Sequence, residues 1–405
     1  MDAFIARQPI FDRQNQVYGY ELLFREGADT FFRGADGDFA TGSLISDAVH
    51  LHGLTKLTEG RKCFVNFTRA SQLNELYTVL PADSTVVEVL ETVEPDGPLI
   101  EACQRARSAG YLLALDDYIL QPRFEILLPL IDVLKVEFPA LSDEQHQMIM
   151  QSARTHGFRT LAEKVESPDE HARAMDYGYS CFQGYFFCRP QLLQSRRLPS
   201  SKLQNMRLLQ LVNQPVFNID RIEQVIRQDL ALSYKLLRFL NSAVFRLHNK
   251  VESIRHAVTL LGQRPLQRWG SLLCLSELGN DKPPELLKTC LVRGRFCEVL
   301  GEKVLPRDQS EECFTVGMFS LLDAVLDRPM DSVVQELALS PVARNSLLFR
   351  DSPLRPVIDL LTAVEQADWQ RLAELTAALG VDDATVSEIY TESVSWAGEI
   401  LGHSS

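Results

Sequence analysis

The chain has 405 residues, with 41 Lys and Arg against 54 Asp and Glu, which gives a formal net charge of −13 at pH 7. This acidic balance argues against general binding to nucleic acid or to an anionic membrane. A hydrophobic content of 45% and a charged content of 23% are typical of a globular protein. The length exceeds what one ordinary core organises, so we expect two domains.

The eight cysteines form no CxxC pair and show no spacing typical of a zinc site. Most lie in apolar segments, where a reduced cysteine behaves as a small hydrophobe, and this is typical of a reducing cytosol. No apolar run reaches the ~18 residues that a membrane span needs, and the first residues do not resemble a signal peptide. We therefore expect a cytoplasmic protein without a membrane span.

The first half of the chain alternates between short apolar strands and helices. Two extended segments joined by a polar turn open it, Phe4–Ile10 and Val17–Phe24, and a helical pattern follows at Thr41–Leu51. Further strands are predicted at Cys63–Asn66, Thr85–Leu90, Leu112–Asp116, Asp132–Val136, Arg159–Ala162 and Tyr179–Gln183. Helices are predicted between them at Arg69–Leu76, Gly97–Ala109, Ser142–Thr155 and Pro168–Tyr177. Repeated strand–helix units indicate parallel strands, and about eight of them predict a TIM-like (β/α)8 barrel.

The second half has a different sequence pattern. From Leu198 onward strand-like runs disappear, and helical periodicity dominates as far as Leu401. A polar Pro/Ser joint at residues 197–202 marks the change. We therefore assign residues 1–198 to an α/β barrel and residues 199–405 to an all-α helical bundle.

Polar side chains stand at the ends of seven successive predicted strands. Asp116 and Asp117 follow an apolar strand directly, and buried acids are costly unless a cation shares their charge. The alternative is that the pair caps a helix, and by itself the pair does not decide between the two. The full set is Glu21, Asn66, Glu88, Asp116 with Asp117, Lys135, Glu163 and Gln183. Because barrel strands deliver their carboxyl ends to one face, we expect these side chains to meet there.

Oxygen ligands of this kind suit Mg²⁺ or Mn²⁺. Two such ions would activate a water and stabilise the leaving oxygen of a phosphodiester. Lys135 among the carboxylates would orient that water and help to deprotonate it, and Arg25 is placed to grip a phosphate.

These motifs resemble the EAL domain, the cyclic-di-GMP phosphodiesterase family. The EAL signature is matched by Glu21-Leu-Leu-Phe-Arg25, after a Gln8-Pro-Ile10 that is similar to the opening QPI of the family. Further motifs of the family are matched by Val65-Asn-Phe-Thr68, Glu88-Val-Leu-Glu91, Asp116-Asp-Tyr118, Lys135, Ala162-Glu-Lys-Val-Glu166 and Gln183-Gly-Tyr185.

The resemblance implies a role for each matched residue. Metal ligands would be Glu21, Asn66, Glu88, Asp116, Asp117 and Glu163. Lys135, Glu163 and Gln183 would be the catalytic residues that position the attacking water. Gln8 and Arg25 would bind the nucleotide, cyclic-di-GMP.

Three departures from the family pattern stand beside these matches. The loop after the paired aspartates is glycine-rich in the family, whereas 117–122 here has no glycine and is about two residues shorter by comparison with that pattern. Leu22 replaces the Ala of EAL, and Lys164 replaces the Gly of AEGVE. We therefore expect nucleotide binding to be retained better than catalysis.

The helical half resembles an HDOD domain, through Asp229–Ser233, Asn241–Ala243 and the stretch 254–262. Gly317–Asp323 lacks the His-Asp pair of an active HD site, so we expect no HD-type metal site in residues 199–405 and interpret His248 and His256 as structural. Arg255, Arg264 and Arg268 are read first as a solvated face, with a partner or nucleotide surface as the alternative. We expect this half to dock protein partners.

The domain order resembles the YuxH-type EAL–HDOD signalling proteins of bacteria. The resemblance implies a cyclic-di-GMP-linked signal transduction protein that binds the nucleotide with weak or no hydrolysis. The alternatives are an active metal-dependent phosphodiesterase that produces pGpG and, more weakly supported, a nucleotide-independent scaffold. The sequence leaves homo-oligomerisation open.

Overall fold

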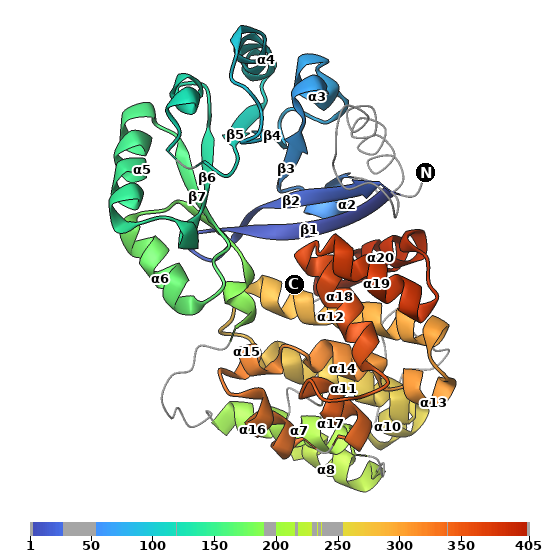
Figure 1. Ribbon diagram of the computed structural model, residues 1–405. Helices are drawn as coiled ribbons and strands as arrows, with labels where there is room; N and C mark the ends of the chain where they lie inside the picture. The colour runs from blue at the N-terminus through green and yellow to red at the C-terminus, as the bar shows by residue number, and fades with distance from the viewer. Residues whose placement is uncertain are drawn as a thin grey trace. The chain divides into compact units, whose positions relative to one another are not determined.

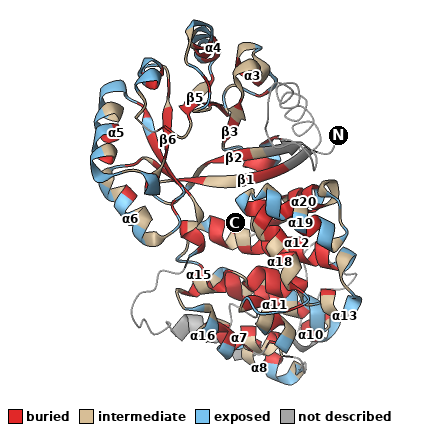
Figure 2. Ribbon diagram, viewed as in Figure 1, coloured by how far each residue is buried: buried red, intermediate tan, exposed pale blue. Residues whose placement is uncertain are grey.

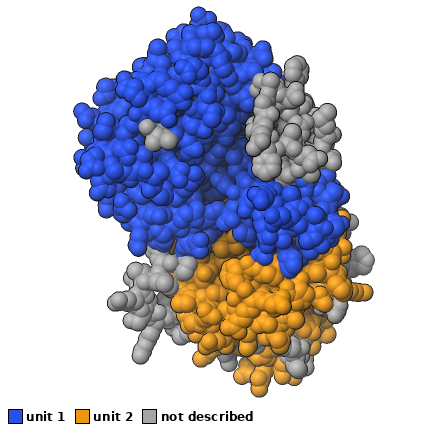
Figure 3. Space-filling view, viewed as in Figure 1, with its two compact units in different colours: residues 1–189, 356–405 blue, residues 190–355 orange. Residues whose placement is uncertain are grey.

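The computed structural model describes residues 3–26, 54–118, 120–189, 200–214, 218–228, 233, 236, 254–337 and 339–402 (Figure 1). The predicted helix Thr41–Leu51, residues 229–232 and 241–243 of the HDOD-like motifs, and His248 lie outside these residues. The chain forms two compact units, residues 1–189 with 356–405 and residues 190–355 (Figure 3).

Eight strands form a closed barrel in chain order, which confirms the predicted fold class. They are β1 (Ala3–Asp12), β2 (Val17–Glu26), β3 (Lys62–Phe67), β4 (Thr85–Val89), β5 (Leu112–Leu115), β6 (Val133–Glu137), β7 (Arg159–Glu163) and β8 (Cys181–Gln183). Strands β2 to β8 run parallel, whereas β1 is antiparallel to both of its neighbours, β2 and β8. The polar turn after Asp12 joins β1 to β2 as a hairpin, and this reverses the direction of the first strand.

Helical segments lie between the parallel strands and after the last of them. They are α2 (Leu54–Thr58), α3 (Arg69–Leu73), η1 (Leu76–Val79), α4 (Gly97–Ser108), η2 (Pro122–Leu127), η3 (Phe138–Ala140), α5 (Asp143–His156), α6 (Pro168–Tyr177) and η4 (Tyr185–Cys188). Ser142 and Ser167 form the predicted capping boxes at the starts of α5 and α6. Between β5 and β6 the described residues form the short 3-10 turn η2 and no α-helix.

One buried residue from each of seven strands packs in the middle of the barrel (Figure 2). These residues are Ile10, Phe64, Val86, Ala114, Val133, Leu161 and Cys181. Because side chains alternate between the two faces of a strand, the next inward-facing residue lies two positions away. Six of the predicted strand-end residues stand at those positions, and Gln8 stands at the corresponding position of antiparallel β1, so the polar layer lies directly above the apolar one.

The last three helices of the chain belong to the same unit as the barrel. They are α18 (Arg355–Gln366), α19 (Trp369–Leu379) and α20 (Asp383–Gly402), and α20 packs against β1 and α2. We predicted residues 199–405 as one domain, and the contacts divide them differently. Helical periodicity shows that a helix has an apolar face but not which surface covers that face, so the sequence pattern assigned these helices to the bundle.

Residues 190–355 form the second unit, which is helical throughout its described part. Its helices are α7 (Ser200–Val212), α8 (Ile219–Gln228), α10 (Ile254–Leu261), α11 (Gln263–Leu278), α12 (Pro284–Val304), α13 (Arg307–Ser310), α14 (Cys313–Phe319), α15 (Leu322–Leu326), α16 (Met330–Glu336) and α17 (Pro341–Leu347). The central pair is α12 with α14, where Gly294 and Gly317 allow close approach of the two helices. None of the helices in the described ranges is both long and apolar enough to cross a membrane.

Candidate metal and nucleotide site

The polar layer at the carboxyl ends of the parallel strands forms the candidate site. Each of its members lies two residues beyond a member of the apolar layer on the same strand: Asn66, Glu88, Asp116, Lys135, Glu163 and Gln183. On antiparallel β1 the corresponding step runs backwards along the chain, from Ile10 to Gln8. Glu21 pairs directly with Gln8 across the β1–β2 hairpin. The structure thus brings the predicted residues together, as the strand-end argument requires.

Lys135 lies at the centre of this layer. Its Nζ is 2.8 Å from Oδ1 of Asp116, 3.0 Å from Oε1 of Glu88, 3.1 Å from Oε1 of Glu163 and 3.5 Å from Oε2 of Glu21. Burial alone would lower the pKa of Lys135, but the four carboxylates outweigh it and raise this pKa well above its usual value. At neutral pH Lys135 is therefore an ammonium that donates hydrogen bonds, and it does not take a proton from water in this form.

Glu21 is held by two amide side chains. Nδ2 of Asn66 donates to its Oε1 at 3.1 Å, and Nε2 of Gln183 donates to its Oε2 at 2.6 Å. Because a charged acceptor roughly doubles the strength of a hydrogen bond, these two amides fix the carboxylate of Glu21 firmly. The side-chain oxygens of both amides, Oδ1 of Asn66 and Oε1 of Gln183, have no hydrogen-bond partner among the described residues.

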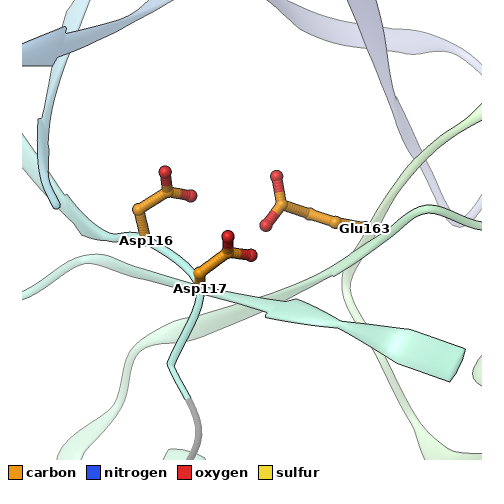
Figure 4. A group of neighbouring side chains, drawn as sticks. All are labelled: Asp116, Asp117 and Glu163. Carbon is orange, nitrogen blue, oxygen red and sulfur yellow. The ribbon is translucent and has the colours of Figure 1, made fainter. Parts of the chain in front are cut away.

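Asp116, Asp117 and Glu163 form a group of three carboxylates that could hold a cation. One oxygen from each lies within 4.8 Å of the others, and the three side chains point toward one another (Figure 4). Burial raises the pKa of Glu163 to about 8, with Lys135 opposing the shift, and burial followed by the charge of Asp116 raises the pKa of Asp117. Without a further cation the three carboxyl groups repel one another, and Asp117 and Glu163 bind protons more strongly.

The residues present fit a divalent metal. Four carboxylates surround the ammonium of Lys135, and Asp117 adds a fifth beside Asp116 and Glu163. Buried oxygens of Asn66, Glu163 and Gln183 have no hydrogen-bond partner in the described chain. An excess of hard oxygen donors around one positive charge is the arrangement that Mg²⁺ or Mn²⁺ would complete. Burial raises the pKa of Glu88 well above its usual value, Lys135 opposes this shift, and the neighbouring carboxylates add to it.

In the loop that carries Asp117, two residues other than glycine have left-handed backbone angles. Asp117 has φ +40° and Leu120 has φ +46°. Hydrogen bonds from the Asp116 amide to Val89 O, 2.9 Å, and from the Tyr118 amide to Lys135 O, 3.1 Å, tie the loop to β4 and β6 on both sides of Asp117. The loop is therefore anchored, at the cost of backbone strain that glycine would avoid.

Lys164, which stands where the family has glycine, is also left-handed, with φ +54°. Its Nζ lies 2.7 Å from Oε2 of Glu137, and the side chain is 57% exposed. Its positive charge opposes the rise in the pKa of Asp117 that burial and Asp116 cause. The glycine of the QGY motif is retained and is required, because at Gly184 (φ +141°) a Cβ would come 2.1 Å from Val165 O.

Of the two predicted nucleotide-binding side chains, the structure describes that of Gln8 but not that of Arg25. The side chain of Arg25 lies outside the described residues, and only its backbone is placed, in β2 opposite Phe4. The amide of Gln8 is already bonded within the protein, to Gln183 and to the carbonyl of Glu365. Sequence reasoning missed the Glu365 contact, and no local signal could have revealed it because the two residues are 357 positions apart.

In the second unit the described residues contain no further carboxylate, histidine or cysteine group that could hold a metal. Arg264 and Arg268 form ion pairs with Glu311 and Glu298. The side chains of Arg255 and His256 are outside the described residues.

The fold and the site define the class of the protein. It is an eight-stranded barrel protein with a carboxylate site at the strand ends, and a helical unit follows the barrel. The family model of the HDOD domain matches residues 198–330. YuxH of Bacillus subtilis is 36% identical over 409 residues, covering 99% of each chain. The cyclic di-GMP phosphodiesterase CdgJ of Vibrio cholerae is 36% identical over 400 residues, covering 98% of this chain and 93% of CdgJ.

The chain therefore belongs to the EAL–HDOD family of YuxH and CdgJ, as the sequence motifs predicted. Among solved structures it is similar to the manganese and cyclic-di-GMP complex of BlrP1 from Klebsiella pneumoniae. That likeness has a TM-score of 0.39 and 20% identity, and it covers 46% of this chain and 55% of BlrP1.

Proposed function

We propose that the barrel binds cyclic-di-GMP together with divalent metal ions, with weak or no hydrolysis, and that the helical unit docks protein partners. The observation that carries the proposal is the convergence of Glu21, Asn66, Asp116 and Glu163 around Lys135, which leaves oxygen donors in excess. The relationship to CdgJ supports the choice of nucleotide.

The side chains suggest how the nucleotide would be held. Bound Mg²⁺ or Mn²⁺ would supply Lewis-acid stabilisation of a phosphodiester and a water of lowered pKa. We propose Glu21, Asn66, Glu88, Asp116, Asp117 and Glu163 as the ligands. Protonated Lys135 would donate a hydrogen bond to a water or phosphate oxygen, and Gln183 would keep Glu21 oriented. Arg25 and Gln8 remain the proposed nucleotide contacts.

Slow turnover is proposed because of the loop. Transition-state stabilisation requires ligands positioned to within a fraction of an ångström, whereas binding tolerates more. Asp117 is presented by a strained, glycine-free loop, with Leu120 and Lys164 also at positive φ. An active phosphodiesterase is the second candidate, favoured by the completeness of the ligand set and by 36% identity to CdgJ.

The test is to measure cyclic-di-GMP binding and conversion to pGpG with Mg²⁺ and with Mn²⁺. We expect metal-dependent binding with little turnover in the wild type, and loss of binding in Glu21→Ala. The matched control is Glu101→Ala, which removes an exposed carboxylate on α4. Rapid conversion would establish the phosphodiesterase, and no binding with either metal would favour a nucleotide-independent scaffold.

A further inference from the structure

The last turn of α18 is hydrogen-bonded to the polar layer of the barrel. Nε2 of Gln8 donates to the carbonyl oxygen of Glu365 at 3.2 Å. Both residues belong to the unit formed by residues 1–189 and 356–405. Gln8 stands in the polar layer itself, opposite Glu21, so the contact reaches the candidate site and not merely the outside of the barrel.

The carbonyl of Glu365 belongs to the last turn of α18. The last four carbonyls of a helix have no amide partner in the regular pattern, and here the amide of Trp369 bonds to Ala367 O at 3.0 Å. Ala367 has φ +53°, which ends α18. The partial negative charge at a helix carboxyl end is unfavourable beside carboxylates. The amide of Gln8 lies between the end of α18 and the carboxylates, and it donates a hydrogen bond to the carbonyl of Glu365.

The direction of this hydrogen-bond chain is fixed by its first member. A main-chain carbonyl only accepts, so the NH₂ group of Gln8 faces Glu365 and its Oε1 faces the site. That oxygen accepts from Nε2 of Gln183 at 3.0 Å, and the same Nε2 donates to Oε2 of Glu21 at 2.6 Å. A flipped Gln183 would place its carbonyl oxygen against the carboxylate of Glu21. The Glu365 carbonyl therefore selects the amide orientation that holds Glu21.

We propose that α18 is a positioning element of the metal site, and that Gln8 is the positioning residue that connects the Glu365 carbonyl to Gln183 and Glu21. Since α18 begins at Arg355, where residues 190–355 end, this helix is one of the two chain segments that connect the helical unit to the unit of the barrel. The proposal rests on the metal site of the proposed function but not on the identity of the nucleotide.

The experiment uses the full chain, with Mn²⁺ alone as the probe. Hydrogen exchange is followed at the amides of Ala367 and Asp368, and Mn²⁺ affinity by calorimetry, for wild type, Gln8→Leu and Gln8→Glu. Leu removes both contacts, whereas Glu keeps an acceptor for Gln183 but cannot donate to Glu365. Gln14→Glu is the control, because Gln14 is exposed in the turn of the same hairpin.

We expect exchange at Ala367 and Asp368 to be about tenfold faster in both Gln8 variants, because one hydrogen bond is lost. Mn²⁺ affinity should fall at least tenfold in Gln8→Leu, as for other residues that orient a ligand. In the wild type, Mn²⁺ should slow exchange at these two amides, by reciprocity of coupling. Gln14→Glu should change none of these.

Exchange that is unchanged at the end of α18 in Gln8→Leu would overturn the proposal, and so would unchanged Mn²⁺ affinity. Protection of the β5 and β6 amides reports whether a variant is folded. The wild-type measurement needs no variant, so Mn²⁺ binding without any effect on α18 is itself a refutation. If Mn²⁺ does not bind at all, the proposed metal site fails, while the exchange of the Gln8 variants still decides whether Gln8 holds α18.

Discussion

Lys135 and Glu88 form an ion pair inside the barrel, with Nζ 3.0 Å from Oε1 and 3.1 Å from Oε2, and both side chains are at most 1% exposed. A buried charge requires a partner, because transfer of an isolated ion from water costs several kcal/mol. Glu88 in turn lies among other carboxyl groups, so the ammonium compensates an acidic layer and not only one residue. The charge of this site therefore changes if the ammonium of Lys135 is removed or if a metal cation is added.

Lys135→Met should destabilise the protein strongly in the absence of divalent metal. Removing one partner of a buried ion pair costs about 3–5 kcal/mol, and here Glu88 and Asp116 lose their shared cation. Mn²⁺ should restore part of the loss, which thermal unfolding with Mn²⁺ and with EDTA would measure. Lys164→Met is the control, since its exposed pair with Glu137 contributes less than about 1 kcal/mol. An equal loss of stability with and without Mn²⁺ would contradict the metal site.

Metal affinity should rise with pH up to about 8. A carboxyl group must lose its proton to bind a metal, and burial raises the pKa of Glu163 to about 8. Mn²⁺ binding would be measured by calorimetry across this range. Glu163→Gln should lower the affinity at least tenfold and flatten the pH dependence near 8. Affinity that does not change with pH in the wild type would show that Glu163 is not a ligand.

Glycine at the strained loop positions should raise turnover. Relief of about 1 kcal/mol of left-handed strain at Leu120 or Lys164 corresponds to roughly fivefold in rate if the strain displaces Asp117 from its catalytic position. We expect faster pGpG formation in the double variant Leu120→Gly, Lys164→Gly, with nucleotide affinity nearly unchanged. Asn15→Gly relieves the same kind of strain (φ 56°) in the β1–β2 turn and should leave turnover as it is. No gain in the double variant would remove the loop as the cause of slow hydrolysis.

His146 should make the free energy of unfolding fall on acidification. Its ring packs in the interior with Nδ1 2.8 Å from the hydroxyl of Tyr179, and burial, followed by the positive charge of Arg173, lowers its pKa. The unfolded chain, with an ordinary pKa of about 6.5, binds more protons, so stability is lost as pH falls through about 6.5.

Denaturant unfolding between about pH 7 and 5 measures this slope, since the titration of an ordinary histidine falls within that interval. His146→Phe should reduce the slope while costing about 1–3 kcal/mol at neutral pH, because the hydroxyl of Tyr179 loses its partner. The exposed Gln151 on the same helix is the control, and Gln151→Ala should leave the slope unchanged. A slope that survives in His146→Phe would assign the pH dependence to other groups.

A fragment of residues 1–198 should be less stable than the barrel in the full chain. It lacks α20, which packs on β1 and contributes the buried side chains Val386, Ile389 and Val394. We expect the fragment to aggregate or to bind hydrophobic dye, and residues 356–405 supplied as a second chain to restore a monomeric barrel. Cooperative unfolding of the 1–198 fragment at the same denaturant concentration as the full chain would contradict the division into units.

Much of the polar layer could be predicted from residues that are close together in the chain. Strand alternation and the capping boxes at Ser142 and Ser167 depend on residues close together in the chain, and both are present in the structure. Because a side chain two positions beyond a core residue points into the same interior, the strand-end pattern predicted that Asn66, Glu88 and Glu163 would converge.

The contacts between segments far apart in the chain are known only from the tertiary structure. An amphipathic pattern indicates that α18 and α20 each bury a face, but only the three-dimensional contacts show that α20 packs on β1 and that Glu365 bonds Gln8. The left-handed backbone at Leu120 and Lys164 is likewise imposed by the loops that contain them, since neither residue favours it. Local composition determined the barrel and the residues of its polar layer, whereas contacts between segments far apart in the chain determined which helices complete the unit and orient Gln183.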